Sequence, residues 1–271
     1  MPERRGNGDM KLGCCLNMLG DKNDAVGRRY IGTLKEAGYD YMELPLAQIM
    51  ELSENSFSEL ADETEKTGLP CECCNNFFPA SVRLTGETVD PAKVQEYVKR
   101  AIDRAVKLGS RVIVFGSSGA KNVPEGFPYD RAFGQIADAL RMIDACAASA
   151  GIHIAIEPLN RQESNIIQNL EEGKKLMTEA GGSSIRLLAD YYHFMLEKES
   201  LETLKKRIPD IVHVHFADPD GRSFPKESRK EYEDFFAELK EGGYDGRVSI
   251  EAYSENKEKE ISEAVFIRKY F

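Results

Sequence analysis

The feature that most constrains the fold is a repeated alternation of short apolar runs with longer amphipathic stretches. The apolar runs fall at 11–19, 39–46, 70–78, 111–117, 152–159, 185–194, 211–218 and 247–254. The stretches that follow them carry apolar residues at helical spacing, as in Val94, Val98, Ala101 and Ala105. Several of these stretches end in glycine, a common helix stop, just before the next apolar run. The pattern therefore predicts eight strand-then-helix units.

Strands that alternate with helices pair in parallel, and eight such units close naturally into a barrel. We therefore predict an α/β protein built as a single (β/α)8 TIM barrel over residues 11–271, a usual length for one such barrel. Residues 1–10 are mostly polar and are expected to form a flexible N-terminal extension. A doubly wound open sheet is the alternative. It is disfavoured because neither a GxGxxG segment after the first run nor a Walker loop occurs.

Charge and composition argue against several classes of partner. The chain has 46 acidic and 36 basic residues, a net charge of −10, which repels nucleic acid. Because no run approaches the roughly 20 apolar residues of a membrane span and no signal segment is seen, we expect no membrane partner and a cytoplasmic location. The 6 cysteines are then expected to be reduced and to pack as small apolar side chains.

Potential metal ligands end the last four predicted strands, at the rim where barrel enzymes place their chemistry. Three of these strands end on Glu157, Asp190 and Glu251, and the fourth carries His213 and His215 on one side. Buried carboxylates are costly unless something pairs with them. A divalent ion would do so, and three carboxylates with an imidazole suit Mn²⁺, Co²⁺ or Mg²⁺ better than Zn²⁺.

Four segments at successive strand ends, EPLNRQE, DYYH, HVHFAD and VSIEAY, resemble the xylose-isomerase-like barrel superfamily. They are most similar to its ketose 3-epimerase and hydroxypyruvate-isomerase branch, and the resemblance covers nearly the whole chain. It implies one divalent metal, Mn²⁺ as first choice with Co²⁺, Mg²⁺ and Zn²⁺ as alternatives. The ligands that it implies are Glu157, Asp190, His215 and Glu251. It also implies that Glu163, His193 and Arg222 bind the substrate, while the third strand end, CCNNFFP, departs from the epimerases and leaves the sugar open.

Two further residues are expected to support this site. Glu43 lies near the end of the second apolar run and is expected to contact the ligands without binding the metal itself. His213 lies farther from the carboxyl end of its strand than His215, so we expect it deeper in the barrel, in a layer beneath the metal.

The chemistry follows from the charge that develops when a proton leaves a carbon beside a carbonyl. A divalent ion stabilises the resulting enediolate as a Lewis acid. Glu157 and Glu251 lie on different strands, so one could remove the proton and the other return it on the opposite face. We therefore predict a divalent-metal-dependent sugar isomerase or epimerase with Glu157 and Glu251 as catalytic residues. Its partner is a small sugar or keto-sugar, and a homo-oligomer (dimer or tetramer) is compatible with the sequence.

Three alternatives stay open. A metal-dependent dehydratase or lyase on a keto-sugar or keto-inositol would use the same enediolate to expel a leaving group. An abasic-site endonuclease shares the barrel but uses several zinc ions and many histidines, whereas this chain has 4 histidines. A non-catalytic sugar-binding barrel is disfavoured by the intact pair Glu157 and Glu251.

Overall fold

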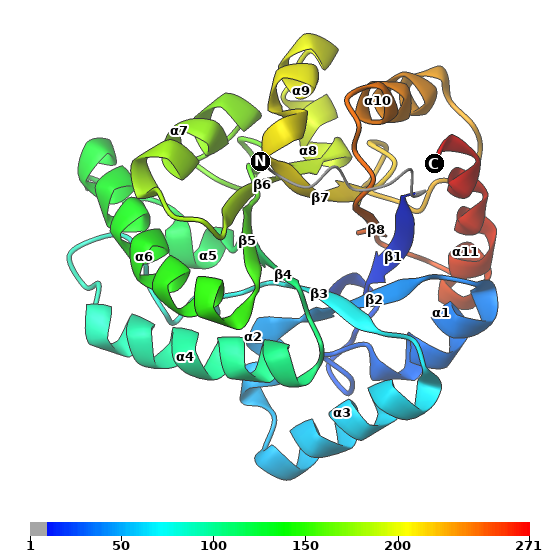
Figure 1. Cartoon of the computed structure of the whole chain (residues 1–271), viewed down its shortest axis with the longest axis horizontal. Coiled ribbons are helices and arrows are strands. Elements are labelled where there is room, and N and C mark those ends of the chain that lie inside the picture. Colours follow the sequence, from blue (N-terminus) through cyan, green and yellow to red (C-terminus); the bar gives the residue numbers. More distant parts are fainter. Residues whose placement is uncertain (1–9) are drawn as a thin grey trace.

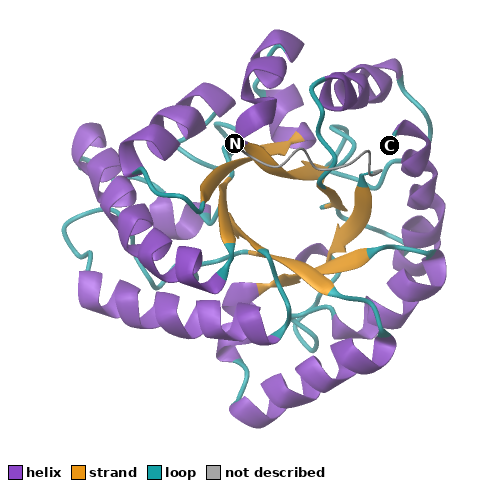
Figure 2. Cartoon of the chain, in the orientation of Figure 1, coloured by secondary structure: helices purple, strands orange, loops and turns teal. Residues whose placement is uncertain are grey.

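The computed structural model describes residues 10–271, and it confirms the predicted TIM barrel. Eight parallel strands pair in sequence order, and β8 closes the barrel against β1. Figure 1 shows the helices arranged around this barrel, and Figure 2 shows the strands as a closed inner ring. The strands are β1 (Lys11–Cys15), β2 (Tyr41–Pro45), β3 (Cys71–Asn75), β4 (Val112–Phe115), β5 (His153–Ile156), β6 (Ile185–Asp190), β7 (Ile211–Phe216) and β8 (Arg247–Ile250).

The helices follow the strands as the sequence pattern predicts. They are α1 (Ile31–Ala37), α2 (Leu46–Glu51), α3 (Glu54–Thr67), α4 (Pro91–Lys107), α5 (Ser118–Lys121), α6 (Tyr129–Ala150), α7 (Leu170–Ala180), α8 (Tyr191–Leu196), α9 (Leu201–Arg207), α10 (Lys230–Glu241) and α11 (Lys257–Glu263). Short 3-10 helices are η1 (Leu16–Met18), η2 (Arg28–Tyr30), η3 (Ile208–Asp210) and η4 (Ala264–Tyr270). Side-chain caps begin α3 at Ser53 and α4 at Asp90, and the expected glycine stop ends α6 at Gly151.

The apolar core has two parts. The larger lies between the strands and the helices and contains residues such as Leu44, Ile154 and Leu140. The smaller fills the barrel interior with Tyr41, Cys73, Val112, Val114, Ala155 and Leu188. Gly13 makes room for this inner layer, because a Cβ there would lie 2.2 Å from the Tyr41 ring. The polar side chains described below therefore pack against a barrel interior that is filled by this inner layer.

The cysteines pack as expected from the sequence. All 6 are free thiols, and Cys14, Cys15, Cys71, Cys73 and Cys74 are buried on β1 and β3. Burial raises the pKa of Cys14 and of Cys15 well above the ordinary value, so both are uncharged thiols at neutral pH. These residues therefore act as small apolar side chains in the barrel wall.

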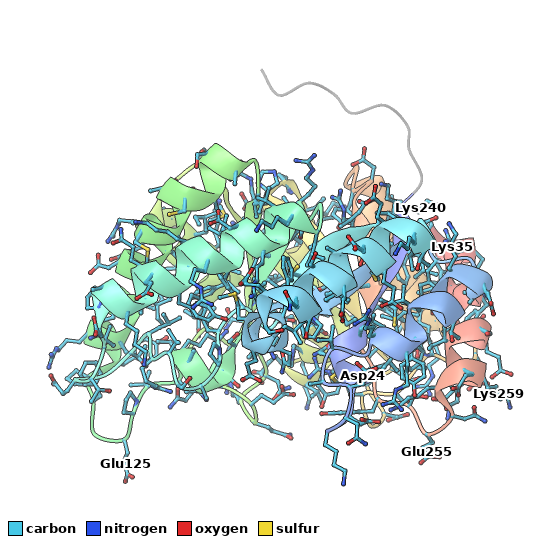
Figure 3. All side chains as sticks on the ribbon, turned by 90° about the horizontal axis from the view of Figure 1, so that it is seen from below. Asp24, Lys35, Glu125, Lys240, Glu255 and Lys259 are labelled. Carbon is cyan, nitrogen blue, oxygen red and sulfur yellow. The ribbon has the colours of Figure 1, made fainter. Side chains whose placement is uncertain are left out.

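The segments that follow the strands gather at one end of the barrel. In Figure 3, Asp24, Glu125 and Glu255, which lie after β1, β4 and β8, are at one end, and Lys240 near the end of α10 is at the other. The carboxyl ends of the strands therefore face the end that carries Asp24, Glu125 and Glu255, where TIM barrels place their active sites. Of the predicted N-terminal extension, residues 1–9 lie outside the described residues, and Met10 is buried in the core.

The sixth apolar run divides into two elements. Residues 185–190 form β6, and the chain then turns at once into helix α8. Asp190 caps this helix, because its side chain accepts a hydrogen bond from the His193 backbone N–H. The turn matters for the site because it places His193 within one helical turn of Asp190.

Candidate metal centre

Four strand ends bring the predicted ligands together. Glu157 follows β5 and Glu251 follows β8, and each continues the barrel ladder by donating its N–H to the neighbouring strand, at 3.2 Å and 3.0 Å respectively. Asp190 is the last residue of β6 and pairs in register with His215 of β7. Parallel strands end at one rim, so this register places the four side chains side by side.

The four side chains form one compact buried cluster. One possible ligand atom from each of Glu157, Asp190, His215 and Glu251 lies within 4.8 Å of the others. His215 Nδ1 is at the centre, 3.0 Å from Glu157 Oε1, 3.2 Å from Glu251 Oε2 and 4.0 Å from Asp190 Oδ2. All four residues are buried. Three carboxylates around one imidazole nitrogen form a donor set that fits a divalent cation.

Glu43 of β2 holds the other side of the His215 ring, as expected from its place near a strand end. Its Oε1 accepts from His215 Nε2 at 2.9 Å, and its Oε2 accepts from His213 Nε2 at 2.7 Å and from Ser249 Oγ at 2.6 Å. Burial alone would raise the pKa of Glu43, but the two histidines hold it well below its ordinary value. A hydrogen bond on Nε2 directs the Nδ1 lone pair of His215 towards the carboxylate cluster.

The two strand-seven histidines occupy different layers. His213 is fully buried and contacts Glu43 and Cys73 beneath the cluster, whereas His215 reaches the carboxylates.

We expect His215→Ala to abolish metal binding. We expect His213→Ala to keep the metal but to lower the free energy of unfolding by about 2–3 kcal/mol, the scale of a buried hydrogen bond to a charged group. Metal analysis and chemical denaturation of both variants check this, and the reverse pattern would contradict it.

The three predicted substrate-binding residues lie next to the cluster or contact a residue that does. Arg222, in the loop after β7, contacts Glu251 Oε2 at 2.5 Å and Glu163 Oε2 at 3.3 Å, and its guanidinium lies over the Tyr192 ring. Its backbone has a left-handed φ of 51°. His193 is buried with Nε2 3.7 Å from Asp190 Oδ2. Burial lowers the pKa of His193 to about 4, so the ring is neutral at pH 7.

Several polar residues in contact with the cluster were missed by the sequence analysis. The amides of Asn17 and Asn75 both donate to Glu251 Oε1, at 3.3 Å and 3.1 Å. Lys121 of α5 is almost fully buried and donates from Nζ to the Glu157 backbone oxygen at 3.0 Å. Asn17 and Asn75 lie near strand ends, so their position is a signal, although an asparagine is a weaker sign of a metal site than a carboxylate or a histidine. The sequence around Lys121 carries no comparable signal.

The charges of the cluster do not balance without a further cation. Four buried carboxylates, those of Glu43, Glu157, Asp190 and Glu251, face two cationic side chains, Lys121 and Arg222. If both histidines are neutral, as metal binding through His215 Nδ1 would require, two negative charges remain, which is the charge that one divalent ion would neutralise. The pKa shifts agree with an excess of negative charge. Burial and the neighbouring Glu251 raise the pKa of Asp190, and Cys15, Glu43 and Glu251 raise the pKa of His215 although burial opposes this.

Gly116, directly after β4, leaves the space that Glu157 occupies. A Cβ at this position would lie 1.8 Å from Glu157 Oε2, which no side chain can tolerate without moving. We expect Gly116→Ala to displace the Glu157 carboxylate and to weaken metal binding by about 10-fold or more, the scale at which misplaced ligands cost affinity. Metal titration measures this. Gly134→Ala, on α6 with nothing within 4 Å of its Cβ, is the matched control and should bind metal as the wild type does.

The fold and the site together define a class of protein: a TIM barrel enzyme with a buried carboxylate–imidazole cluster at the carboxyl ends of its strands. The chain belongs to the xylose isomerase-like TIM barrel family, whose model matches residues 31–270. This confirms the superfamily that the strand-end segments indicated.

Several curated relatives are sugar epimerases. The chain is 24% identical over 253 residues to a 3-dehydro-D-guloside 4-epimerase of Escherichia coli (strain K12), covering 89% of this chain and 92% of the relative. It is 26% identical over 262 residues to a ketose 3-epimerase of Arthrobacter globiformis, with 90% and 84% coverage. Among solved structures, a D-allulose 3-epimerase from Methylomonas sp. in complex with D-allulose has a TM-score of 0.84 at 22% identity, covering 97% of this chain and 98% of that chain. This last similarity supports the fold.

Proposed function

We propose that this protein is a divalent-metal-dependent sugar epimerase that inverts a carbon next to a carbonyl group. The observation that carries the proposal is the cluster of Glu157, Asp190, His215 and Glu251, whose ligand atoms lie within 4.8 Å of one another at the catalytic rim. The sugar epimerases among its relatives support the same reaction class.

The proposed metal ligands are the same four side chains, with His215 binding through Nδ1. The donor set and the two uncompensated negative charges of the cluster both favour one divalent ion, with Mn²⁺ as first choice. When bound, such an ion polarises a carbonyl as a Lewis acid and lowers the energy of the enediolate. Lys121 and Glu43 keep two of the ligands in place, Lys121 through the Glu157 backbone and Glu43 through the His215 ring.

Glu157 and Glu251 are the proposed acid–base pair. They leave β5 and β8, from different sides of the cluster, and approach the same nitrogen of His215 at 3.0 Å and 3.2 Å. A substrate carbon between the two carboxylates could lose its proton to one and receive a proton from the other, which inverts the centre. Asn17 and Asn75 donate to Glu251 Oε1 and hold its carboxylate in position, while Arg222 contacts Oε2.

Arg222 is proposed to bind substrate oxygens together with Glu163 and His193. We expect Arg222→Met to lower kcat/KM by at least about 10-fold, the scale of a lost charged hydrogen bond, while the metal content stays unchanged. Steady-state kinetics and metal analysis on the same samples check this. Arg229→Met is the matched control, because Arg229 lies on the same loop but pairs with Asp218 and Asp220. Metal loss in Arg222→Met would contradict the assignment.

The substrate is proposed to be a keto-sugar. The relatives include both 3-epimerases and a 4-epimerase, so inversion at C3 of a ketose and at C4 of a 3-keto-sugar are the two positions to test. These relatives give no support to the dehydratase alternative.

Location and assembly stay predictions from the sequence. None of the helices in residues 10–271 has the length and apolar character that crossing a bilayer requires. We propose a cytoplasmic enzyme that works as a dimer or tetramer and does not bind nucleic acid. Cell fractionation tests the location, and sedimentation of the purified protein tests the assembly.

The test of the proposed function is a substrate panel read by NMR. Ketoses, 3-keto-sugars and keto-inositols are incubated with the Mn²⁺-loaded protein in deuterated water. We expect an epimer of at least one keto-sugar, with solvent deuterium on the inverted carbon. A deoxy-keto product would support the dehydratase instead. Turnover of no keto-sugar would overturn the proposal.

A further inference from the structure

His193 is held from one side by a single residue, Asn160, in the segment after β5. The His193 Nδ1 atom lies 2.8 Å from Asn160 Nδ2 and 3.2 Å from the Asn160 backbone nitrogen. Both residues are almost fully buried, at 3% and 1% exposure. Water therefore contributes little to the choice of hydrogen-bond partner at this ring nitrogen.

The orientation of the Asn160 amide is fixed by its other contacts. Its Oδ1 accepts from the backbone N–H groups of Gln162 and Glu163, at 2.9 Å and 3.2 Å. Its Nδ2 donates to Glu163 Oε1 at 3.0 Å, a carboxylate that can only accept. A flipped amide would lose all three bonds. The amide NH₂ group therefore faces His193.

Two N–H groups directed at Nδ1 make this atom an acceptor. In a neutral imidazole one ring nitrogen accepts and the other carries the proton, so the proton of His193 is on Nε2. Within residues 10–271, Nε2 is a buried polar atom with no hydrogen-bond partner. Unpaired buried N–H groups are rare in folded proteins and call for an explanation.

The unpaired Nε2–H faces the candidate metal centre. It lies 3.7 Å from Asp190 Oδ2, the same oxygen that lies 3.7 Å from Arg222 Nη2 and 4.0 Å from His215 Nδ1. Asp190 Oδ2 is thus surrounded by a metal ligand and by two residues proposed to bind substrate. A substrate oxygen bound beside Asp190 would be within reach of the His193 donor.

We propose that Asn160 is a positioning residue that fixes His193 as an Nε2–H donor to a substrate oxygen. That oxygen gains negative charge when the neighbouring carbon loses its proton, and a preset donor stabilises such charge. Asn160 also holds Glu163 through the same NH₂ group, so one amide orients two substrate-binding side chains. The inference rests on the proposed function and adds a residue that sequence reasoning had not assigned.

The first test reads the ring nitrogens directly. The protein has 4 histidines, so ¹⁵N-histidine labelling gives a short spectrum in which His193→Gln identifies the His193 signals. We expect a protonated Nε2 and an unprotonated Nδ1 in the wild type. In Asn160→Asp a carboxylate acceptor replaces the closer side-chain donor, and only the backbone N–H at 3.2 Å still points at Nδ1, so we expect the proton to move to Nδ1. Gln162→Glu, which adds the same charge at an exposed neighbour, should leave the wild-type pattern. A protonated Nδ1 in the wild type, or no change in Asn160→Asp, would overturn the proposal.

The second test separates donation from packing. The side-chain amide of Gln can replace Nε2–H, whereas the shorter amide of Asn reaches only the place of Nδ1, so we expect His193→Gln to keep more activity than His193→Asn. Asn160→Asp should lower kcat by about 10²-fold, the cost of losing one such donor, with metal content unchanged. Equal activity of His193→Gln and His193→Asn would overturn the donor role. A wild type inactive on every keto-sugar would count against the proposed function, while the nitrogen spectra still decide the role of Asn160.

Discussion

Asp190→Asn protein should fold normally and fail to bind its metal. The substitution keeps the shape of the side chain and its capping bond to His193, because Asn caps helices as well as Asp does. It removes one of the three carboxylates whose negative charge the metal is proposed to neutralise. Losing a residue that only supports a ligand costs about 10- to 100-fold in metal affinity, so for a ligand itself we expect a fall of at least about 100-fold.

Thermal unfolding with and without Mn²⁺ measures this without any substrate. Metal at 100 times its Kd should stabilise the wild type by about 2.7 kcal/mol, and the same concentration should barely affect Asp190→Asn. Asp218→Asn is the matched control: Asp218 is a buried carboxylate after β7, bound by Tyr232 and Arg229 outside the cluster. It should lose stability but keep its response to metal. Full metal response in Asp190→Asn would remove Asp190 from the ligand set.

The strand-end residues could be predicted because barrel topology needs little information beyond the order of elements. Once eight strand–helix units are recognised, the carboxyl ends of the strands must meet at one rim. Glu157, Asp190 and Glu251 end their predicted strands, so their proximity follows from the fold class. The choice of His215 over His213 follows in the same way from distance along one strand.

The supporting contacts depend on register and on loop paths, which a single sequence does not encode in any local pattern. Glu43 meets His213 and His215 across the barrel, at a sequence separation of about 170 residues. Asn160 reaches His193 because α8 begins directly after β6, and the apolar run 185–194 carries no signal for a helix beginning there. Local periodicity identifies elements, but it does not say which loop atom faces which side chain.

The largest kinetic effect is expected from Glu157→Gln and Glu251→Gln. Gln keeps the size of the side chain but cannot take a proton, so epimerisation should fall by about 10²-fold or more in each variant. Because both residues are also proposed ligands, metal content is measured in the same samples, and rates are compared at full occupancy. Asp218→Asn is again the matched control, since this buried carboxylate contacts Tyr232 and Arg229 and lies outside the ligand cluster. It should keep the metal and most of the proton transfer.

Deuterium exchange then distinguishes two bases from one. If each carboxylate serves one face of the substrate, a variant that lacks one base can still remove the proton that faces the other. We therefore expect Glu157→Gln to exchange solvent deuterium into one epimer without inversion, and Glu251→Gln to do the same with the opposite epimer. NMR of each epimer incubated separately in deuterated water gives the result. Exchange of the same epimer by both variants would mean that a single base serves both faces, and wild-type product without solvent label would overturn the two-base proposal.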